Sequence, residues 1–326
     1  MIVLLLFIVP LFLISLAAKG VNGINPSPLI KEDQSIPPLT DNQPLGITIM
    51  TYNIGYASGD KNNLGAVLSK EEVLSNLDQI AQVIQNQNPD LIALQEVDID
   101  AARSYHINQA EYLAKKAGYP YTATVITWNK RYVAWPYWPP QNQFGQVVSG
   151  QTILSRYPLK EQQVILFDKP KNNPFWYNWF YLDRMVQFLQ VELPQGSLSI
   201  WATHLEAFDS QTREEQANIL SRYIAANNNK PTLLLGDFNS ISKKASNLTL
   251  KEETEIEDNG QSLAIIENMT GLINAESSIT GLTFPSWKPI KKIDHIFYRS
   301  DLKLKSVQVI EGILASDHLP LVAEFN

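Results

Sequence analysis

The sequence predicts an α/β domain with mixed sheets, because short strand-like runs alternate with helix-like runs along most of the chain. The composition agrees. The 326 residues are 44% hydrophobic and 18% charged, which is ordinary for a globular protein and supplies enough apolar side chains for a sizeable core. No internal repeat or low-complexity block interrupts the alternation, so we expect one folded α/β domain.

The first elements have clear local signals. Apolar and polar residues alternate over residues 46–52, which predicts a strand that ends at Asn53. Ser69, followed by acidic residues in the next turn, is a typical helix start, and apolar residues then recur at helical spacing over residues 69–87. A short buried strand at residues 91–94 follows and leads to Glu96.

The remaining elements follow the same pattern. A second helix is predicted at residues 108–117, where Gly118 ends it, and a third at residues 212–226. Further strands are expected at residues 121–126, 151–154, 185–193, 197–203, 232–235, 292–298 and 319–325.

Two loop-like segments are unusually aromatic. Residues 128–144 and 175–181 contain five of the seven tryptophans, and six of the seven residues in the second segment are aromatic. Such residues suit a lipid interface, sugar stacking or base stacking, or they form a small hydrophobic cluster under a long loop. The candidate contacts to a substrate or membrane are Trp135, Trp138, Trp176 and Trp179.

The N-terminal region differs from the rest. Residues 2–18 contain no charged residue, so we expect residues 1–18 to be a signal peptide or a membrane anchor. Residues 19–45 are polar and contain five prolines, which is typical of a tether. The folded domain then covers residues 46–326. This order predicts a secreted, periplasmic or membrane-anchored protein whose catalytic domain lies outside the cytoplasm.

Charge and cysteine content limit the function classes. The formal net charge of −7 argues against binding nucleic acid by bulk attraction, although it allows a nuclease whose metal supplies local positive charge. The chain has no cysteine, which excludes disulfides, thiol nucleophiles and cysteine metal sites. No Gly-x-Ser-x-Gly elbow accompanies the histidines and aspartates, so the sequence gives no support to a serine hydrolase.

Polar side chains follow several of the expected strands. Their carboxylate and amide oxygens suit Mg²⁺ or Mn²⁺, which commonly binds phosphate oxygens. If the strands share a sheet, these side chains meet at one edge; the alternative is that each is an ordinary turn residue. They are Asn53, Glu96, Asp237, Asn239 and Asp317.

Three of the four histidines lie beside carboxylates. His204 has Glu206 two residues away, and His318 directly follows Asp317. A histidine held by a carboxylate can donate a proton to a phosphate oxygen. His295 follows Asp294 inside an apolar strand, so the two side chains face opposite sides, and we favour Asp294 as the functional one.

Six short motifs together resemble the endonuclease/exonuclease/phosphatase superfamily. The resemblance covers residues 46–326 and implies a four-layer α/β/β/α sandwich with two mixed sheets and a divalent-metal phosphoesterase activity. The motifs that carry it are Tyr52-Asn53, Gln95-Glu96, Thr203-His204-Leu205, Gly236-Asp237-Phe238-Asn239, Asp294-His295 and Ser316-Asp317-His318.

The resemblance also implies roles for these residues. Asn53, Glu96 and Asp317 match the residues of the metal site, which we expect to hold Mg²⁺ or Mn²⁺. The matching catalytic residues are His204, Asp237, Asn239, Asp294 and His318. His295 stands where relatives frequently have a tyrosine, and we interpret it as structural.

We expect an exported or membrane-tethered monomer that hydrolyses a phosphodiester, with a phospholipid or related headgroup favoured. A membrane surface would then contact the N-terminal run and the aromatic loops. Three alternatives stay open: an extracytoplasmic nuclease acting on DNA or RNA, an inositol-phosphate-type phosphomonoesterase, and a non-catalytic binding module. Lys288, Lys291 and Lys292 would give a nuclease local positive charge.

Three further polar residues are ambiguous. Arg103 and Tyr105, soon after Glu96, either reach the substrate or lie on the surface. Arg184 opens a strand and either faces the site or forms a structural ion pair.

Overall fold

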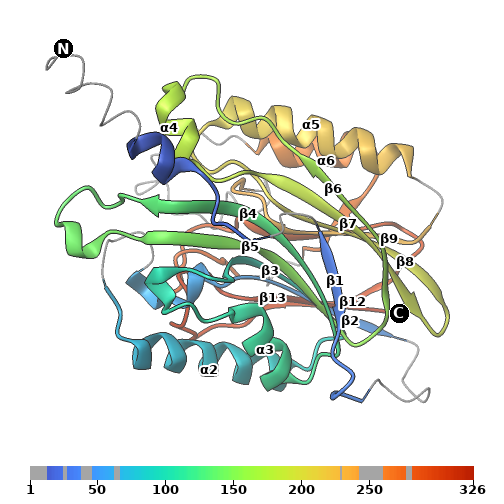
Figure 1. Cartoon of the computed structure of the whole chain (residues 1–326). Helices are drawn as coiled ribbons and strands as arrows, with labels where there is room; N and C mark the ends of the chain where they lie inside the picture. The colour runs from blue at the N-terminus through green and yellow to red at the C-terminus, as the bar shows by residue number, and fades with distance from the viewer. Residues whose placement is uncertain are drawn as a thin grey trace, which may run out of the picture.

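The computed structural model of the chain (Figure 1) describes residues 13–24, 28–37, 46–61, 67–227, 230–241, 260–276 and 281–326. Two sheets lie face to face between two layers of helices. Helices α2 (Lys70–Gln87) and α3 (Gln109–Ala117) cover one sheet, and α5 (Ser210–Ala226) and α6 (Gln261–Thr270) cover the other. This confirms the expected four-layer α/β/β/α sandwich.

The first sheet has seven strands in the order β1-β4-β5-β3-β2-β13-β12. Only β2 and β3 run parallel, so the sheet is mixed. The strands are β1 (Leu29–Glu32), β2 (Ile47–Asn53), β3 (Leu91–Asp98), β4 (Tyr121–Val133), β5 (Gly145–Ser155), β12 (Leu304–Val309) and β13 (Leu321–Phe325).

The second sheet has six strands in the order β10-β11-β9-β8-β7-β6. It is also mixed, because β8 and β9 are its one parallel pair. The strands are β6 (Leu159–Leu166), β7 (Met185–Leu193), β8 (Gly196–His204), β9 (Thr232–Asp237), β10 (Ile273–Asn274) and β11 (Asp294–Tyr298).

The apolar side chains form three main clusters that hold the layers together. The central cluster joins the inner faces of the two sheets, with Ile49 from β2 and Leu233 from β9 both fully buried. A second cluster places Leu77 of α2 beneath the first sheet, and a third places Leu220 of α5 on the second. Burial of these side chains from water is the main force that stabilises the sandwich.

The helix starts follow the local sequence. Ser69 and Glu72 form a capping box at the start of α2, because each side chain accepts a hydrogen bond from the backbone N–H of the other residue. At the start of α3 the Asn108 side chain accepts a hydrogen bond from the Glu111 backbone N–H, and at the start of α5 the Asp209 side chain accepts one from the Thr212 backbone N–H. The predicted helices at residues 69–87, 108–117 and 212–226 therefore begin within two residues of α2, α3 and α5.

Several elements were not expected from the sequence. Residues 29–32, inside the predicted tether, form β1 and pair with β4. Phe175–Phe180 forms the short helix α4 where a loop was expected. β6, β10, β12 and α6 were also missed, as were the short 3₁₀ helices at Gly55–Ala57, Gly59–Lys61, Ala102–Ser104 and Pro140–Asn142.

The N-terminal prediction is only partly covered by the structure. Residues 1–12 of the expected signal peptide or anchor lie outside the described residues, whereas residues 13–18 are helical. Among the described residues, none of the helices has both the length and the apolar character needed to span a membrane.

Candidate active site

The polar residues singled out in the sequence meet where strand ends of both sheets come together. In the parallel pair β2 and β3, Asn53 lies opposite Gln95. In the parallel pair β8 and β9, His204 lies opposite Asp237, and β11 places Asp294 opposite the same Asp237. Register therefore brings residues that are far apart in the sequence to one edge of the sandwich.

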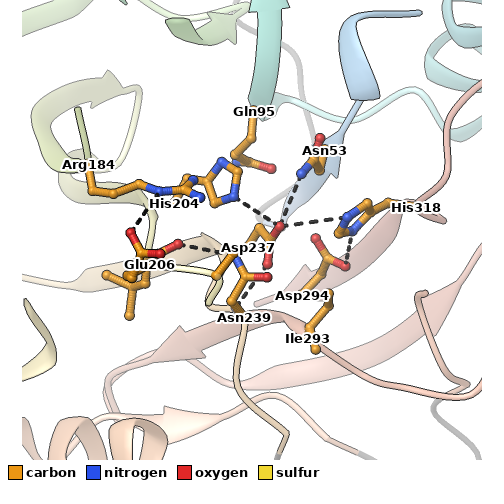
Figure 2. Close-up of polar contacts among 12 residues, drawn as sticks. Asn53, Gln95, Arg184, His204, Glu206, Asp237, Asn239, Ile293, Asp294 and His318 are labelled. Carbon is orange, nitrogen blue, oxygen red and sulfur yellow. Dashed lines mark hydrogen bonds and ion pairs between the residues drawn. The ribbon is translucent and has the colours of Figure 1, made fainter. Parts of the chain in front are cut away.

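Asp237 is the centre of this arrangement (Figure 2). Its Oδ2 accepts a hydrogen bond from Asn53 Nδ2 at 3.0 Å and lies 3.3 Å from His204 Nε2 and 3.7 Å from His318 Nε2. Its Oδ1 accepts a hydrogen bond from the backbone N–H of Asn239 at 2.9 Å. Donors from four chain segments thus surround one buried carboxylate.

The residues beside Asp237 allow this geometry. Gly236 has φ +148°, and a Cβ there would lie 1.9 Å from the Thr203 carbonyl oxygen, so a side chain would push β8 away from β9. Asn239 has φ 48°, a left-handed conformation that asparagine adopts more readily than most residues. Its Nδ2 donates to the Leu205 carbonyl at 3.1 Å, which ties the β8 and β9 ends together.

His318 and Asp294 form a buried pair behind Asp237. His318 Nδ1 lies 2.9 Å from Asp294 Oδ2, and the Phe284 ring packs against the imidazole. Ser316 fixes the His318 loop, since its hydroxyl donates to the Asn53 carbonyl at 2.7 Å and accepts from the His318 backbone N–H. The His318 imidazole is therefore held with Nε2 turned toward Asp237.

Charge and burial set the protonation of these groups. Burial raises the pKa of Asp237 to about 7. The positive charge of His318 and the hydrogen bonds that Asp237 accepts from Asn239 and Asn53 act in the opposite direction. Burial would lower the pKa of His318, but the charges of Asp294 and Asp237 outweigh it and raise the pKa to about 10.

The two histidines are therefore in different states. Burial, with the positive charges of Arg184 and His318, holds the pKa of His204 well below 6.5, although Asp237 lies only 3.3 Å away. Burial outweighs the attraction of Asp237, because the Asp237 carboxylate is itself partly protonated near neutral pH. His318 is a cation at neutral pH and His204 is a neutral hydrogen-bonding group.

A pocket opens beside His204. Glu96, at a bulge of β3 with φ 53°, lines it together with His204 and Arg184. Arg184 is almost fully buried, and within the described part of the chain its Nε and Nη1 have no hydrogen-bond partner. Its Nε lies 3.9 Å from Glu206 Oε2. A buried guanidinium with free N–H groups is suited to a phosphate anion.

The same edge can hold a divalent cation. Asp237, Asp294 and His318 each place one ligand-type atom within 4.8 Å of the others. The raised pKa of His318 makes this imidazole a proton donor rather than a ligand, because a protonated imidazole has no free lone pair. Asp294 Oδ1 is buried and has no partner among the described residues. Hard ions prefer oxygen ligands such as these carboxylates, and this edge also carries the amide and carboxylate oxygens of Asn53, Glu96 and Asp317.

Of the two carboxylates expected beside the histidines, Asp317 lies next to His318, whereas Glu206 does not pair with His204. Asp317 is buried next to His318, and its charge contributes to the raised pKa of that imidazole. The expected pairing of His204 with Glu206 does not form. Glu206 accepts instead from the Tyr181 hydroxyl at 2.7 Å and the Phe208 backbone N–H, because the chain leaves β8 at His204 and turns Glu206 toward Arg184.

Arg103 and Tyr105 make contacts within the fold. Arg103 makes two hydrogen bonds to Asp98, at 2.9 and 3.0 Å, and its guanidinium lies 3.6 Å from the centre of the Tyr56 ring. Tyr105 donates its hydroxyl to the Leu68 carbonyl at 2.7 Å. Neither is one of the residues that line the pocket, so a role for them as substrate contacts stays a prediction.

His295 and Lys292 form a second buried polar cluster behind Asp294. Lys292 Nζ lies 3.0 Å from His295 Nδ1 and 3.3 Å from the Asp294 carbonyl oxygen, and 3.8 Å from Glu276. His295 Nε2 lies 2.9 Å from the Ser240 carbonyl oxygen, as a structural histidine would. Because Lys292 is buried, it does not supply the surface positive charge that the nuclease hypothesis expected from it.

The four tryptophans named as candidate contacts are exposed. Trp135 and Trp138 lie beyond the end of β4, whereas Trp176 and Trp179 belong to α4. Thr127 of β4 and Leu182, shortly after α4, line the same pocket as Glu96 and His204. Each aromatic segment is thus continuous in sequence with one residue of the pocket wall.

Comparisons with known proteins agree with this geometry. The profile of the Endonuclease/Exonuclease/phosphatase family matches residues 50–318. A comparison with curated proteins gave no match.

Similar solved structures share the fold. An endonuclease/exonuclease/phosphatase from Beutenbergia cavernae is 21% identical, with 86% of this chain and 71% of that chain covered and a TM-score of 0.60. The Bacteroides thetaiotaomicron mannosyl-6-phosphatase is 17% identical, with 86% and 99% covered and a TM-score of 0.59. The human Nocturnin catalytic domain, which has a bound sulfate anion, is 18% identical, with 92% and 96% covered and a TM-score of 0.57.

Proposed function

This chain belongs to the endonuclease/exonuclease/phosphatase family, and we propose that it hydrolyses a phosphodiester with a divalent metal ion, Mg²⁺ or Mn²⁺. The favoured substrate is a phospholipid or a related headgroup. The observation that carries the proposal is the buried Asp237 carboxylate with Asn53, His204 and His318 directed at it. This set of groups provides a base, proton donors and anion-binding groups within one small volume.

Asp237 is the general base. Its pKa of about 7 lets the carboxylate accept a proton from water at neutral pH, where a base is most effective when its pKa is near the working pH. The N–H groups of Asn53 and Asn239 fix both carboxylate oxygens. The attacking water is thereby aligned for in-line displacement at phosphorus.

His318 and His204 stabilise the negative charge that builds on the phosphate. His318 carries its proton at neutral pH and is held by Asp294, so its Nε2–H is a charged donor. His204 is a neutral donor on the opposite side of Asp237. Hydrogen-bond donors fixed before the reaction are effective because they need no reorganisation in the transition state.

Glu96, Asn53 and Asp317 would hold the metal ion, whose chemistry is to neutralise a non-bridging phosphate oxygen. Arg184, which lines the pocket together with Glu96 and His204, would supply positive charge for a second phosphate oxygen. The ion and the guanidinium together would balance the charge of a phosphodiester.

Three features support a lipid substrate over a polynucleotide. The net charge is −7, and the buried Lys292 presents no charge to a polyanion. Exposed aromatic side chains are concentrated in two segments, which suits contact with a bilayer interface. The uncharged run at residues 2–18 supports a domain that works outside the cytoplasm, next to a membrane.

The test is hydrolysis by the full chain with Mg²⁺ on sphingomyelin and phosphatidylinositol, compared with plasmid DNA and an inositol phosphate. We expect release of the phosphorylated headgroup, and loss of this activity with EDTA followed by recovery with added Mg²⁺. Cleavage of DNA alone would exclude the lipid substrate, and turnover of the monoester alone would exclude a phosphodiesterase. Undiminished activity in EDTA would exclude the metal requirement.

A further inference from the structure

Seven aromatic residues form an exposed surface at the end of the β4–β5 hairpin and on α4. We call it the aromatic surface, and it consists of Trp135, Tyr137, Trp138, Phe175, Trp176, Tyr177 and Trp179. The exposed fractions of Trp138, Phe175 and Tyr137 are 79%, 70% and 64%. So many exposed rings in two neighbouring segments are unusual, because large apolar patches on soluble domains mark interaction sites.

The two segments of the aromatic surface are held to each other and to the domain. The Trp128 indole N–H donates to the Phe180 carbonyl at 2.7 Å, which joins β4 to the end of α4. Lys169 donates to the carbonyls of Asn178 and Tyr181, at 3.0 and 2.7 Å, and so fixes α4 from below. The pKa of Tyr177 is raised by burial and also by Tyr137, which shows that the two segments are close. The exposed rings are therefore presented on a supported surface.

The N-terminal segment runs along the base of this surface. The backbone N–H of Arg131 donates to the Lys19 carbonyl at 2.9 Å, and the Val21 N–H donates to Asn129 Oδ1 at 2.7 Å. Arg131 Nε also donates to the Gly20 carbonyl. These bonds fix the end of the uncharged run at residues 2–18 beside β4, and Leu13 in that run is exposed. Figure 1 shows this segment in dark blue near the free end of the hairpin.

We propose that the aromatic surface binds the surface of a lipid bilayer. Tryptophan and tyrosine concentrate at bilayer interfaces because their rings are apolar and their N–H or O–H groups reach water. The adjacent basic side chains of Lys19, Lys130 and Arg131 suit anionic headgroups.

Bilayer binding does not depend on catalysis, so the two proposals can fail separately. The first experiment is flotation of the full chain with vesicles of phosphatidylcholine, alone or mixed with phosphatidylglycerol. Truncating the two most exposed rings, in the Trp138→Ala/Phe175→Ala variant, should weaken binding at least about tenfold, because each ring removes on the order of 100 Å² of apolar surface from water. The matched control is Tyr223→Ala, which removes an exposed ring near the far end of α5. Asp237→Asn should bind as wild type does.

The N-terminal run by itself can bind vesicles, so a second measurement is needed. The run contains no tryptophan, and the first tryptophan of the chain is Trp128. Brominated phosphatidylcholine should quench the tryptophan fluorescence of the wild type. The Trp135→Phe/Trp138→Phe/Trp176→Phe/Trp179→Phe variant should lose most of the quenching while it remains bound and folded.

Three results would overturn the proposal. One is quenching that does not change in the four-tryptophan variant, and another is equal flotation of wild type and the Trp138→Ala/Phe175→Ala variant. The third is a dimer in sedimentation velocity that the same two substitutions convert to a monomer, because a second copy of the chain would then cover the surface. Circular dichroism and thermal unfolding identical to wild type would show that loss of binding is not loss of fold.

Discussion

His318 Nδ1 and Asp294 Oδ2 lie 2.9 Å apart in a pair that is closed to solvent, and this pair directs His318 Nε2 toward Asp237. The two residues come from different elements: Asp294 begins β11, and His318 lies in the loop before β13. Asp294 therefore determines both the orientation of the imidazole and the proton that it carries.

Removing either member of this pair should reduce activity strongly. His318→Ala should lower kcat by about 10²- to 10⁴-fold, the usual contribution of a positioned proton donor. Asp294→Asn should act in the same direction, and the double variant should lose less than the product of the two single losses because the residues act as a unit. Steady-state kinetics on the preferred substrate measures this. The matched control is His106→Ala, which breaks an exposed histidine pair with Asp100 and should keep full activity.

Asp237→Asn should abolish the base and leave the fold intact. The expected loss in kcat is about 10²- to 10⁴-fold. The thermal midpoint should stay the same or rise, because burial raises the pKa of Asp237 and a neutral amide avoids that desolvation cost. Asp301→Asn, an exposed site, is the control. Near wild-type turnover in Asp237→Asn would mean that another group accepts the proton.

The rate should depend on pH in a bell-shaped way. Asp237 has a raised pKa, so it remains protonated and inactive as a base until the pH passes about 7. His318 also has a raised pKa, so it remains a charged donor until the pH passes about 10. Accordingly, kcat/KM should rise through about pH 7 and fall through about pH 10. Asp294→Asn should move the upper limb to lower pH, and a profile that stays flat through both neutral and alkaline pH would contradict both assignments.

Lys292→Met should destabilise the domain although it touches no substrate. Lys292 is buried and lies 3.8 Å from Glu276. Loss of the ammonium group therefore leaves the mostly buried Glu276 carboxylate without the Lys292 cation. Breaking a buried pair on one side costs about 3 kcal/mol or more. Denaturant unfolding should show this loss, and Lys292→Met/Glu276→Gln should recover part of it. Lys291→Met, at the less buried neighbour, should unfold at the wild-type denaturant concentration.

Those parts of the fold that have strong local signals could be predicted from the sequence. The Ser69 and Glu72 capping box and the apolar spacing that follows define α2 closely. α4 was missed because its six residues are mostly aromatic and carry no capping signal. β1 was missed because a four-residue edge strand in a proline-rich stretch gains its stability from pairing with β4, which no local pattern reveals.

The site shows the same division. The strand-end positions of Asn53, His204 and Asp237 follow from sequence pattern and register, since parallel strands end at one edge. The hydrogen-bond or ion-pair partner of each group could not be predicted in this way. Glu206 turns away from His204 toward Tyr181, and Arg184 enters the pocket, because the path of the chain between strands decides these contacts. The position of Arg184 was left open for that reason.

Pairing of β1 with β4 also covers part of an edge of the first sheet. β1 pairs with residues 121–124, at the start of the thirteen-residue strand β4. Without β1, the free N–H and C=O groups of these residues could pair with another molecule of the same chain. β1 has only four residues and carries the charged side chains of Lys31 and Glu32, which make a poor template for such pairing. The predicted tether at residues 19–45 thus protects the domain against edge-to-edge aggregation. A shortened chain that begins at residue 46 would lose that protection.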